Sequence, residues 1–159
     1  MKWIFGVTLA LIAFAVPGNA QGKTVPVLDK LLAGFVEAFN RRDAATLASF
    51  YAEDGVLMAP DMPMIRGRAN IEAAVNKMFE RGGVLKLAAT VSEISGSQAF
   101  AAGTFTVTIS GGTSLTLTGV GGAGGSLTFA AKFLTVFKRV GSDWKIAFDM
   151  QNADQPPPK

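Results

Sequence analysis

Any catalysis by this chain would have to use carboxylates, lysines, arginines or its only tyrosine, Tyr51. The 159 residues include no histidine and no cysteine. Serine–histidine and cysteine–histidine catalysis are therefore excluded, and so are imidazole and thiolate metal ligands. A carboxylate that acts as a general base remains open. We expect no metal site and no cofactor.

A loop rich in proline and methionine, residues 60–64, carries a candidate carboxylate, Asp61. Asp61 is either a catalytic base or a solvated turn residue between two prolines. Arg66 follows, and it either binds an anionic group of a ligand or pairs with a surface carboxylate. Three methionines share this region and either adapt to apolar ligands or fill an irregular loop: Met58, Met62 and Met64.

The first half of the chain predicts helices that could position these groups. Apolar residues recur at helical spacing between residues 28 and 39, which is typical of an amphipathic helix. Asp43 is a good N-cap for a short second helix, on which we place Leu47, Phe50 and Tyr51. A third helix is expected after Arg66 and ends at the glycine pair 82–83.

The second half predicts a sheet, because apolar and polar residues alternate from Val84 onward. A short strand is expected first, at residues 56–59. The later strands are expected at residues 84–94, 98–110, 126–140 and 144–151. Helices followed by antiparallel strands predict an α+β domain, with a curved antiparallel sheet wrapped around the N-terminal helices.

Residues 111–125 are rich in glycine and predict a hairpin insertion. Gly119, Gly121 and Gly124 match the G-x-G-x-x-G spacing of dinucleotide sites. Such a site needs a helix directly after the glycines, whereas residues 126–129 predict a strand, so we reject it. The domain is expected to span residues 21–153, followed by a proline-rich tail at residues 154–159.

The N-terminus has the pattern of a signal peptide at residues 1–20: a basic residue, an apolar run and small residues before Ala20. An uncleaved anchor is the alternative. Cleavage would give an exported protein, periplasmic or secreted, without a stable membrane span. The 15 basic and 12 acidic residues are scattered, so we expect no nucleic-acid binding.

Two segments resemble the SnoaL-like and ketosteroid-isomerase-like families of the nuclear transport factor 2-like superfamily. Residues 34–71 read GFVEAFNRRDAATLASFYAEDGVLMAPDMPMIRGRANI, and residues 132–152 read KFLTVFKRVGSDWKIAFDMQN. The shared features are the FNRRD helix end, the YAEDGV turn, the Arg66-Gly67 pair and the final hairpin. The resemblance implies a cone-shaped α+β domain with an internal cavity, and frequent dimerisation through the sheet.

The isomerase branch of this superfamily uses a carboxylate base, a tyrosine and a protonated aspartate. In this chain the three positions fall at Ala59, at Phe35 and near Thr135. None of these side chains can perform the required role. We therefore expect no steroid-isomerase chemistry.

Alternation on the last strand places Ile146, Phe148, Met150 and Asn152 on the face that lines the cavity in the family, and Asp149 and Gln151 on the other. The predicted apolar wall is Phe35, Phe39, Tyr51, Met58, Phe133, Phe148 and Met150. The predicted polar contacts are Thr135, Asn152 and Arg66. The Tyr51 hydroxyl either projects into the cavity or is satisfied by backbone in the core.

Three functions fit this sequence. The first is an exported domain that binds a small, mostly apolar ligand. The second is a polyketide-cyclase-like or lyase-like enzyme that uses Asp61 and Tyr51. The third is an oligomeric adaptor, a homodimer whose interface is the outer face of the sheet around Lys132, Leu134 and Val136.

Overall fold

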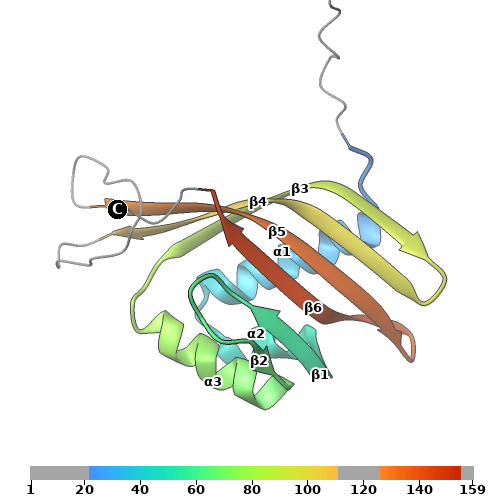
Figure 1. The fold of residues 1–159 in the computed structure, drawn as a ribbon, viewed down its shortest axis with the longest axis horizontal. Coiled ribbons are helices and arrows are strands. Elements are labelled where there is room, and N and C mark those ends of the chain that lie inside the picture. The colour runs from blue at the N-terminus through green and yellow to red at the C-terminus, as the bar shows by residue number, and fades with distance from the viewer. Residues whose placement is uncertain (1–21, 111–125, 155–159) are drawn as a thin grey trace, which may run out of the picture.

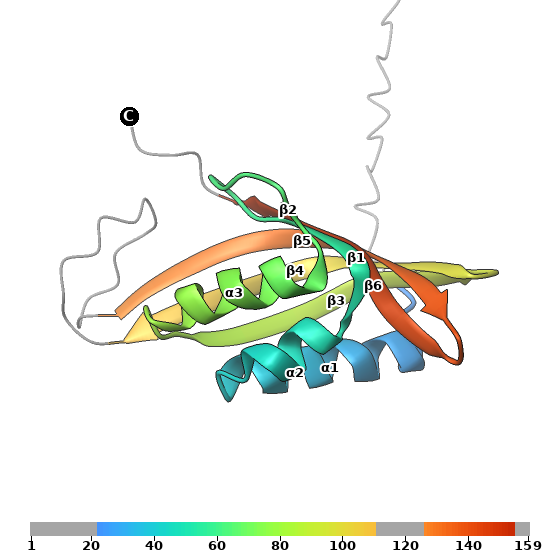
Figure 2. The same cartoon turned by 90° about the horizontal axis from the view of Figure 1, so that it is seen from below.

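The computed structural model describes residues 22–110 and 126–154. These residues form a curved sheet that covers a layer of helices, as the two views in Figures 1 and 2 show. The helices are α1 (Pro26–Asn40), α2 (Ala44–Ser49) and α3 (Arg68–Phe79). The strands are β1 (Tyr51–Met58), β2 (Ile65–Arg66), β3 (Val84–Ser95), β4 (Gln98–Ser110), β5 (Ser126–Val140) and β6 (Asp143–Ala153). The predicted α+β architecture is confirmed, while the predicted signal peptide and glycine-rich hairpin, and most of the predicted tail, lie outside the described residues.

Helix α1 forms where the apolar periodicity predicts it. Pro26 occupies its first turn, where a missing N–H costs no hydrogen bond. Leu28, Leu32 and Phe39 are buried against the concave side of the sheet. At the end of the helix, the Asn40 side chain accepts a hydrogen bond from the Leu85 N–H (2.8 Å) and donates one to the Leu85 carbonyl (3.0 Å). This pair of bonds fastens α1 to the start of β3.

Helix α2 is shorter than the sequence suggests. Asp43 is its N-cap as predicted, with Oδ1 accepting a hydrogen bond from the Thr46 N–H at 2.9 Å. Tyr51, however, is not helical and begins β1. The Phe50 carbonyl accepts a hydrogen bond from the Ile146 N–H (2.8 Å), and Tyr51 pairs with Ile146. Pairing with β6 therefore outweighs the local helical preference.

The sheet has the order β2-β1-β6-β5-β4-β3 and is not closed into a barrel. All neighbouring strands are antiparallel except β1 and β6, which are parallel. This parallel pair is a departure from the expected antiparallel sheet. It arises because the chain runs through α3 and four strands before β6 returns beside β1, so no hairpin fixes their relative direction.

A bulge in β6 changes which side chains in the second half of the strand face the interior. Val136 pairs with Phe148 but the next residue, Phe137, pairs with Ile146, so Ala147 is an extra residue on β6. Ile146 and Asp149 are consequently both buried, whereas Phe148 and Met150 are each 47% exposed. The prediction that Phe148, Met150 and Asn152 face inward is wrong, because uninterrupted alternation does not hold across the bulge.

A second irregularity bends the sheet between β3 and β4. The register shifts between Ala89 and Val91, opposite Gly103 and Ala102. A Cβ on Gly103 would lie only 2.0 Å from the Ala88 carbonyl oxygen. Only glycine allows the two backbones to approach this closely.

Candidate functional site

A cavity of about 340 Å³ lies between the helices and the concave side of the sheet. Its size falls in the range of small-molecule sites. Aliphatic and aromatic side chains form most of its wall: Leu32, Phe35, Phe39, Leu47, Leu57, Leu85, Leu87, Phe105, Val107 and Phe133. Polar groups are few, and they gather in one cluster on the sheet and at one end of α3.

The cluster on the sheet is centred on the Asp149 carboxylate, which is 5% exposed. Its Oδ2 accepts hydrogen bonds from the Tyr51 hydroxyl (2.9 Å) and the Gln151 amide (3.2 Å). Its Oδ1 accepts one from the Thr135 hydroxyl (3.0 Å). A carboxylate oxygen has two lone pairs, so Oδ1 retains capacity for one further hydrogen bond.

Burial of Asp149 in this apolar wall raises the pKa of its carboxyl, because desolvation disfavours the charged form. The three hydrogen bonds act in the opposite direction and offset part of the effect. Burial together with the neighbouring carboxylate also raises the pKa of Tyr51 well above its ordinary value. Tyr51 is thus a neutral donor, and the Asp149 carboxyl takes up a proton more readily than an exposed aspartate does.

Several contacts hold Tyr51 in place. Arg68, the first residue of α3, donates from Nε (3.0 Å) and Nη2 (2.8 Å) to the Tyr51 carbonyl. The same guanidinium pairs with Glu53 at 2.6 Å. The Phe35 ring packs against the Tyr51 ring with centroids 6.3 Å apart. These contacts fix the hydroxyl that orients Asp149, so Arg68 and Phe35 position the site.

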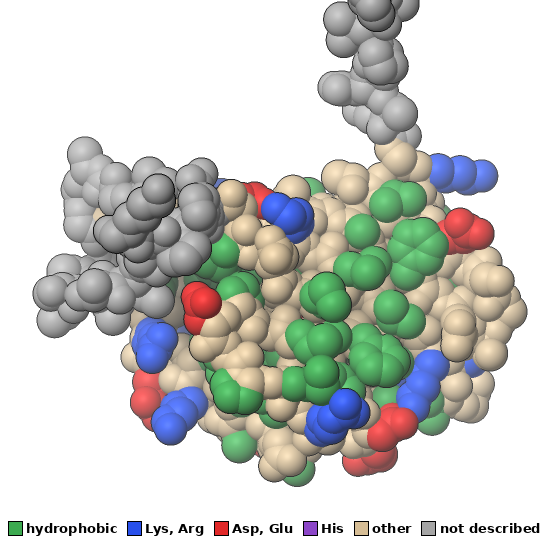
Figure 3. Space-filling model, in the orientation of Figure 1, with side chains coloured by type: hydrophobic (Ala, Val, Ile, Leu, Met, Phe, Trp, Pro, Cys, Tyr) green, Lys and Arg blue, Asp and Glu red, His purple; other side chains and the backbone are tan. Residues whose placement is uncertain are grey.

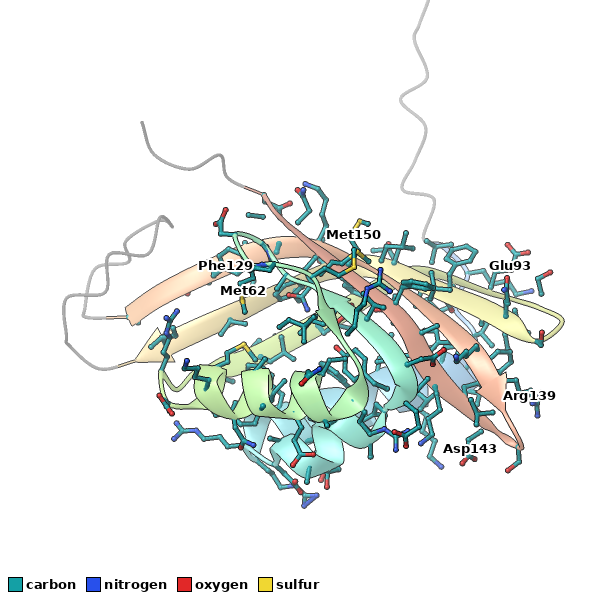
Figure 4. All side chains as sticks on the ribbon, turned by 60° about the horizontal axis from the view of Figure 1, so that its bottom comes forward. Met62, Glu93, Phe129, Arg139, Asp143 and Met150 are labelled. Atoms are coloured by element: carbon teal, nitrogen blue, oxygen red, sulfur yellow. The ribbon has the colours of Figure 1, made fainter. Side chains whose placement is uncertain are left out.

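The structure brings five of the predicted site residues to the cavity: Phe35, Phe39, Tyr51, Phe133 and Thr135. The others do not line it: Met58, Asp61, Arg66, Phe148, Met150 and Asn152. Asp61 is exposed in the loop before β2, whereas its neighbour Met62 reaches the cavity wall. Figure 4 shows Met150 over β6, on the side of the sheet away from α3.

Sequence reasoning missed Asp149 and Gln151 as cavity residues. Both were assigned to the outer face because of the expected alternation along β6. Ala147, the bulge residue, has no feature that distinguishes it from a regular strand residue. Tyr51 lines the cavity, and its hydroxyl donates to a side chain 98 residues away, not to backbone.

Among residues 22–110 and 126–154, no group of acidic side chains is placed to hold a metal ion. Within the same ranges, no helix is long and apolar enough to cross a membrane.

Comparisons with known proteins agree with this architecture. The sequence model of the SnoaL-like domain matches residues 32–147, and the chain therefore belongs to the SnoaL-like family. No protein of curated function matches the sequence significantly.

Solved structures share the fold at low sequence identity. A ketosteroid isomerase-like protein from Erwinia carotovora atroseptica is 21% identical with a TM-score of 0.67, covering 82% of this chain and 96% of its own. A protein from Novosphingobium aromaticivorans, described as NTF2-like with a cystatin-like fold, is 18% identical with a TM-score of 0.66 over 81% and 80%. A candidate dehydratase of the NTF2-like family from Streptomyces avermitilis is 17% identical with a TM-score of 0.66 over 82% and 97%.

Proposed function

We propose that this protein binds a small, mostly apolar molecule in the cavity, with one polar group of the ligand hydrogen-bonded to Asp149. The observation that carries the proposal is a buried carboxylate on a mostly apolar wall. Burying a carboxylate costs free energy that only hydrogen bonds or opposite charges offset. Asp149 keeps an unused acceptor position beside a cavity of ligand size, which supports a functional reason for its burial.

Two matched variants on α3 test this binding. Ala74 lines the cavity, whereas the neighbouring Ala73 is exposed. We expect wild type to bind N-phenyl-1-naphthylamine, a neutral apolar probe whose fluorescence rises in an apolar site. Ala74→Phe should weaken this binding about tenfold or more because it occupies the cavity, whereas Ala73→Phe should leave it unchanged. Equal probe affinity in all three proteins would reject the cavity as the binding site.

A second candidate function is proton transfer, and the raised pKa of Asp149 favours it. A carboxylate in a water-poor site is a suitable base for a proton on a carbon next to a carbonyl group. In this role Asp149 replaces Asp61, and Tyr51 orients the base. Two of the structural neighbours, an isomerase-like protein and a candidate dehydratase, support this class of reaction.

We further propose that the outer face of the sheet forms a homodimer. Register places apolar residues in two adjacent rows across four strands: Phe100, Val136 and Phe148 in one, and Val91, Ala102, Leu134 and Met150 in the other. Figure 3 shows hydrophobic side chains gathered on this face. Exposed apolar patches of this kind commonly mark interaction sites. An adaptor that binds another protein through the same face is the alternative.

Light scattering tests the dimer. We expect wild type at twice the monomer mass and the double variant Leu134→Glu/Phe148→Glu at the monomer mass, because two charges would be buried unpaired at the interface. Val27→Glu is the matched control, since Val27 is similarly exposed (45%) but lies on α1. A monomeric wild type would exclude the homodimer and leave the adaptor.

We also propose that residues 1–20 are removed during export. The proposal rests on the sequence pattern at Lys2 to Ala20. N-terminal sequencing of the protein recovered outside the cytoplasm is expected to begin at Gln21. An intact Met1 in that fraction would contradict it.

A further inference from the structure

Two basic side chains line the cavity at the end of α3. Lys77 lies in the last turn of the helix and Arg81 two residues beyond its end, one helical turn after Lys77. Both are exposed. Among the described residues, Asp149 is the only other ionisable side chain on the cavity wall apart from Tyr51. The cavity therefore has a buried acid on the sheet and two cations where it meets solvent.

Neither cation forms an ion pair within the described part of the chain. All 12 aspartates and glutamates belong to residues 22–110 and 126–154. Four ion pairs form among these residues, and none includes Lys77 or Arg81. A third cation lies close by, because Arg42 Nη2 is 3.3 Å from the position that a Cβ on Gly82 would occupy. This end of the cavity thus has an excess of positive charge.

Stabilisation of the helix end accounts for only part of this arrangement. A lysine in the last turn is favourable next to the partial negative charge of a helix C-terminus. The carbonyls of Met78 and Phe79, however, already accept hydrogen bonds from the Arg81 and Gly82 N–H groups, both at 3.1 Å. The Arg81 side chain is therefore not required to satisfy them, and its place on the cavity wall needs another reason.

We propose that Lys77 and Arg81 bind the anionic group of the ligand, so that the natural ligand is an apolar organic acid. Its apolar body fills the cavity, a polar group reaches Asp149, and its carboxylate or related anion remains near solvent between the two cations. This inference rests on the proposed ligand-binding function and specifies the class of ligand. Arginine and lysine at a pocket opening also attract anions over a distance of about one Debye length.

A matched pair of probes separates anion recognition from apolar binding. 1-Anilinonaphthalene-8-sulfonate carries a sulfonate on the same ring system as neutral N-phenyl-1-naphthylamine. In the double variant Lys77→Gln/Arg81→Gln at low salt, we expect about tenfold weaker binding of the sulfonate, since two partly exposed ion pairs are lost. The neutral probe should bind within twofold of wild type. In 0.5 M salt the Debye length is about 4 Å. Wild type should therefore prefer the sulfonate over the neutral probe less strongly at this salt concentration.

The control variant Lys30→Gln/Lys86→Gln removes the same charge from exposed positions that do not line the cavity. We expect it to bind both probes like wild type. Decanoate and decanol are then used to displace the neutral probe. The variant Lys77→Gln/Arg81→Gln should weaken displacement by the carboxylate decanoate and leave displacement by decanol unchanged. The anion site is wrong if Lys77→Gln/Arg81→Gln binds the sulfonate as well as wild type does. It is also wrong if the control variant loses as much affinity for the sulfonate. In either case the proposed binding of apolar ligands in the cavity is unaffected. If wild type binds neither probe, the proposed function falls as well.

Discussion

Asp149→Asn is expected to reduce protein-catalysed hydrogen–deuterium exchange at the carbon next to the carbonyl of 2-tetralone by at least about 100-fold. This apolar ketone is a model substrate for proton abstraction. Wild-type Asp149 would take the proton, exchange it with D2O and return a deuteron to the enolate. Asparagine keeps the shape and can still accept the Tyr51 hydrogen bond, but it cannot accept a proton. Mass spectrometry of the ketone measures the rate.

Asp61→Asn is the matched control for this experiment. Asp61 is exposed and does not line the cavity, so its variant should exchange at the wild-type rate. Retained exchange in Asp149→Asn, or loss in Asp61→Asn, would reject Asp149 as the base. If wild type produces no exchange above buffer, proton transfer is excluded, and ligand binding remains as the function.

The same variant should change how stability depends on pH. The pKa of Asp149 is raised in the folded protein above about 3.9, the value in an unfolded chain. Between these two values the folded protein holds a proton that the unfolded chain has lost, so wild-type stability falls as pH rises. Asparagine does not titrate, so the stability of Asp149→Asn does not fall with pH for this reason. The free energy of unfolding of Asp149→Asn minus that of wild type should therefore increase from pH 3 to neutral pH, as measured by urea denaturation.

Gly103→Ala is expected to destabilise the fold by about 3 kcal/mol or more, because the added methyl group would overlap backbone atoms. Its nearest neighbours would be the Ala88 carbonyl oxygen at 2.0 Å and Ala89 Cα at 2.8 Å. Neither atom can move without opening the β3–β4 ladder. Since this bend helps to curve the sheet around the cavity, probe binding should weaken in parallel. Urea denaturation of the variant measures the loss.

Gly96→Ala is a control for the loss of glycine itself. Gly96 has a φ of +59° in the β3–β4 turn, and nothing lies within 4 Å of its added Cβ. Only conformational strain opposes alanine there, about 1 kcal/mol. If Gly103→Ala cost no more than Gly96→Ala, close backbone contact would not be the reason for glycine at position 103.

The sequence predicts most of the fold because its signals are local. Apolar spacing places α1, the Asp43 cap places the start of α2, and two of the long strands, β4 and β5, have the predicted bounds. The parallel β1–β6 pair was not predictable in this way. It depends on which strands meet after more than 80 intervening residues, and local alternation holds no information on that pairing.

Four of the five predicted residues that line the cavity belong to elements that the sequence places correctly. Phe35, Phe39, Phe133 and Thr135 line the cavity because helical and strand periodicity continues unbroken through them. The prediction fails on the last strand after Ala147. Because Ala147 is an extra residue, Asp149 and Gln151 face the cavity in place of Phe148 and Met150. A bulge depends on the partner strand, so one strand read alone does not reveal it.

Titration of the buried Asp149 carboxyl decides whether it is a functional group of the cavity. The ¹³Cγ resonance of Asp149, assigned by its absence in Asp149→Asn, can be followed against pH with and without N-phenyl-1-naphthylamine. We predict a midpoint above the ordinary aspartate pKa that rises further when the probe excludes water from the cavity. An ordinary midpoint that does not change when the probe binds would show that Asp149 is not a buried carboxyl at the ligand cavity.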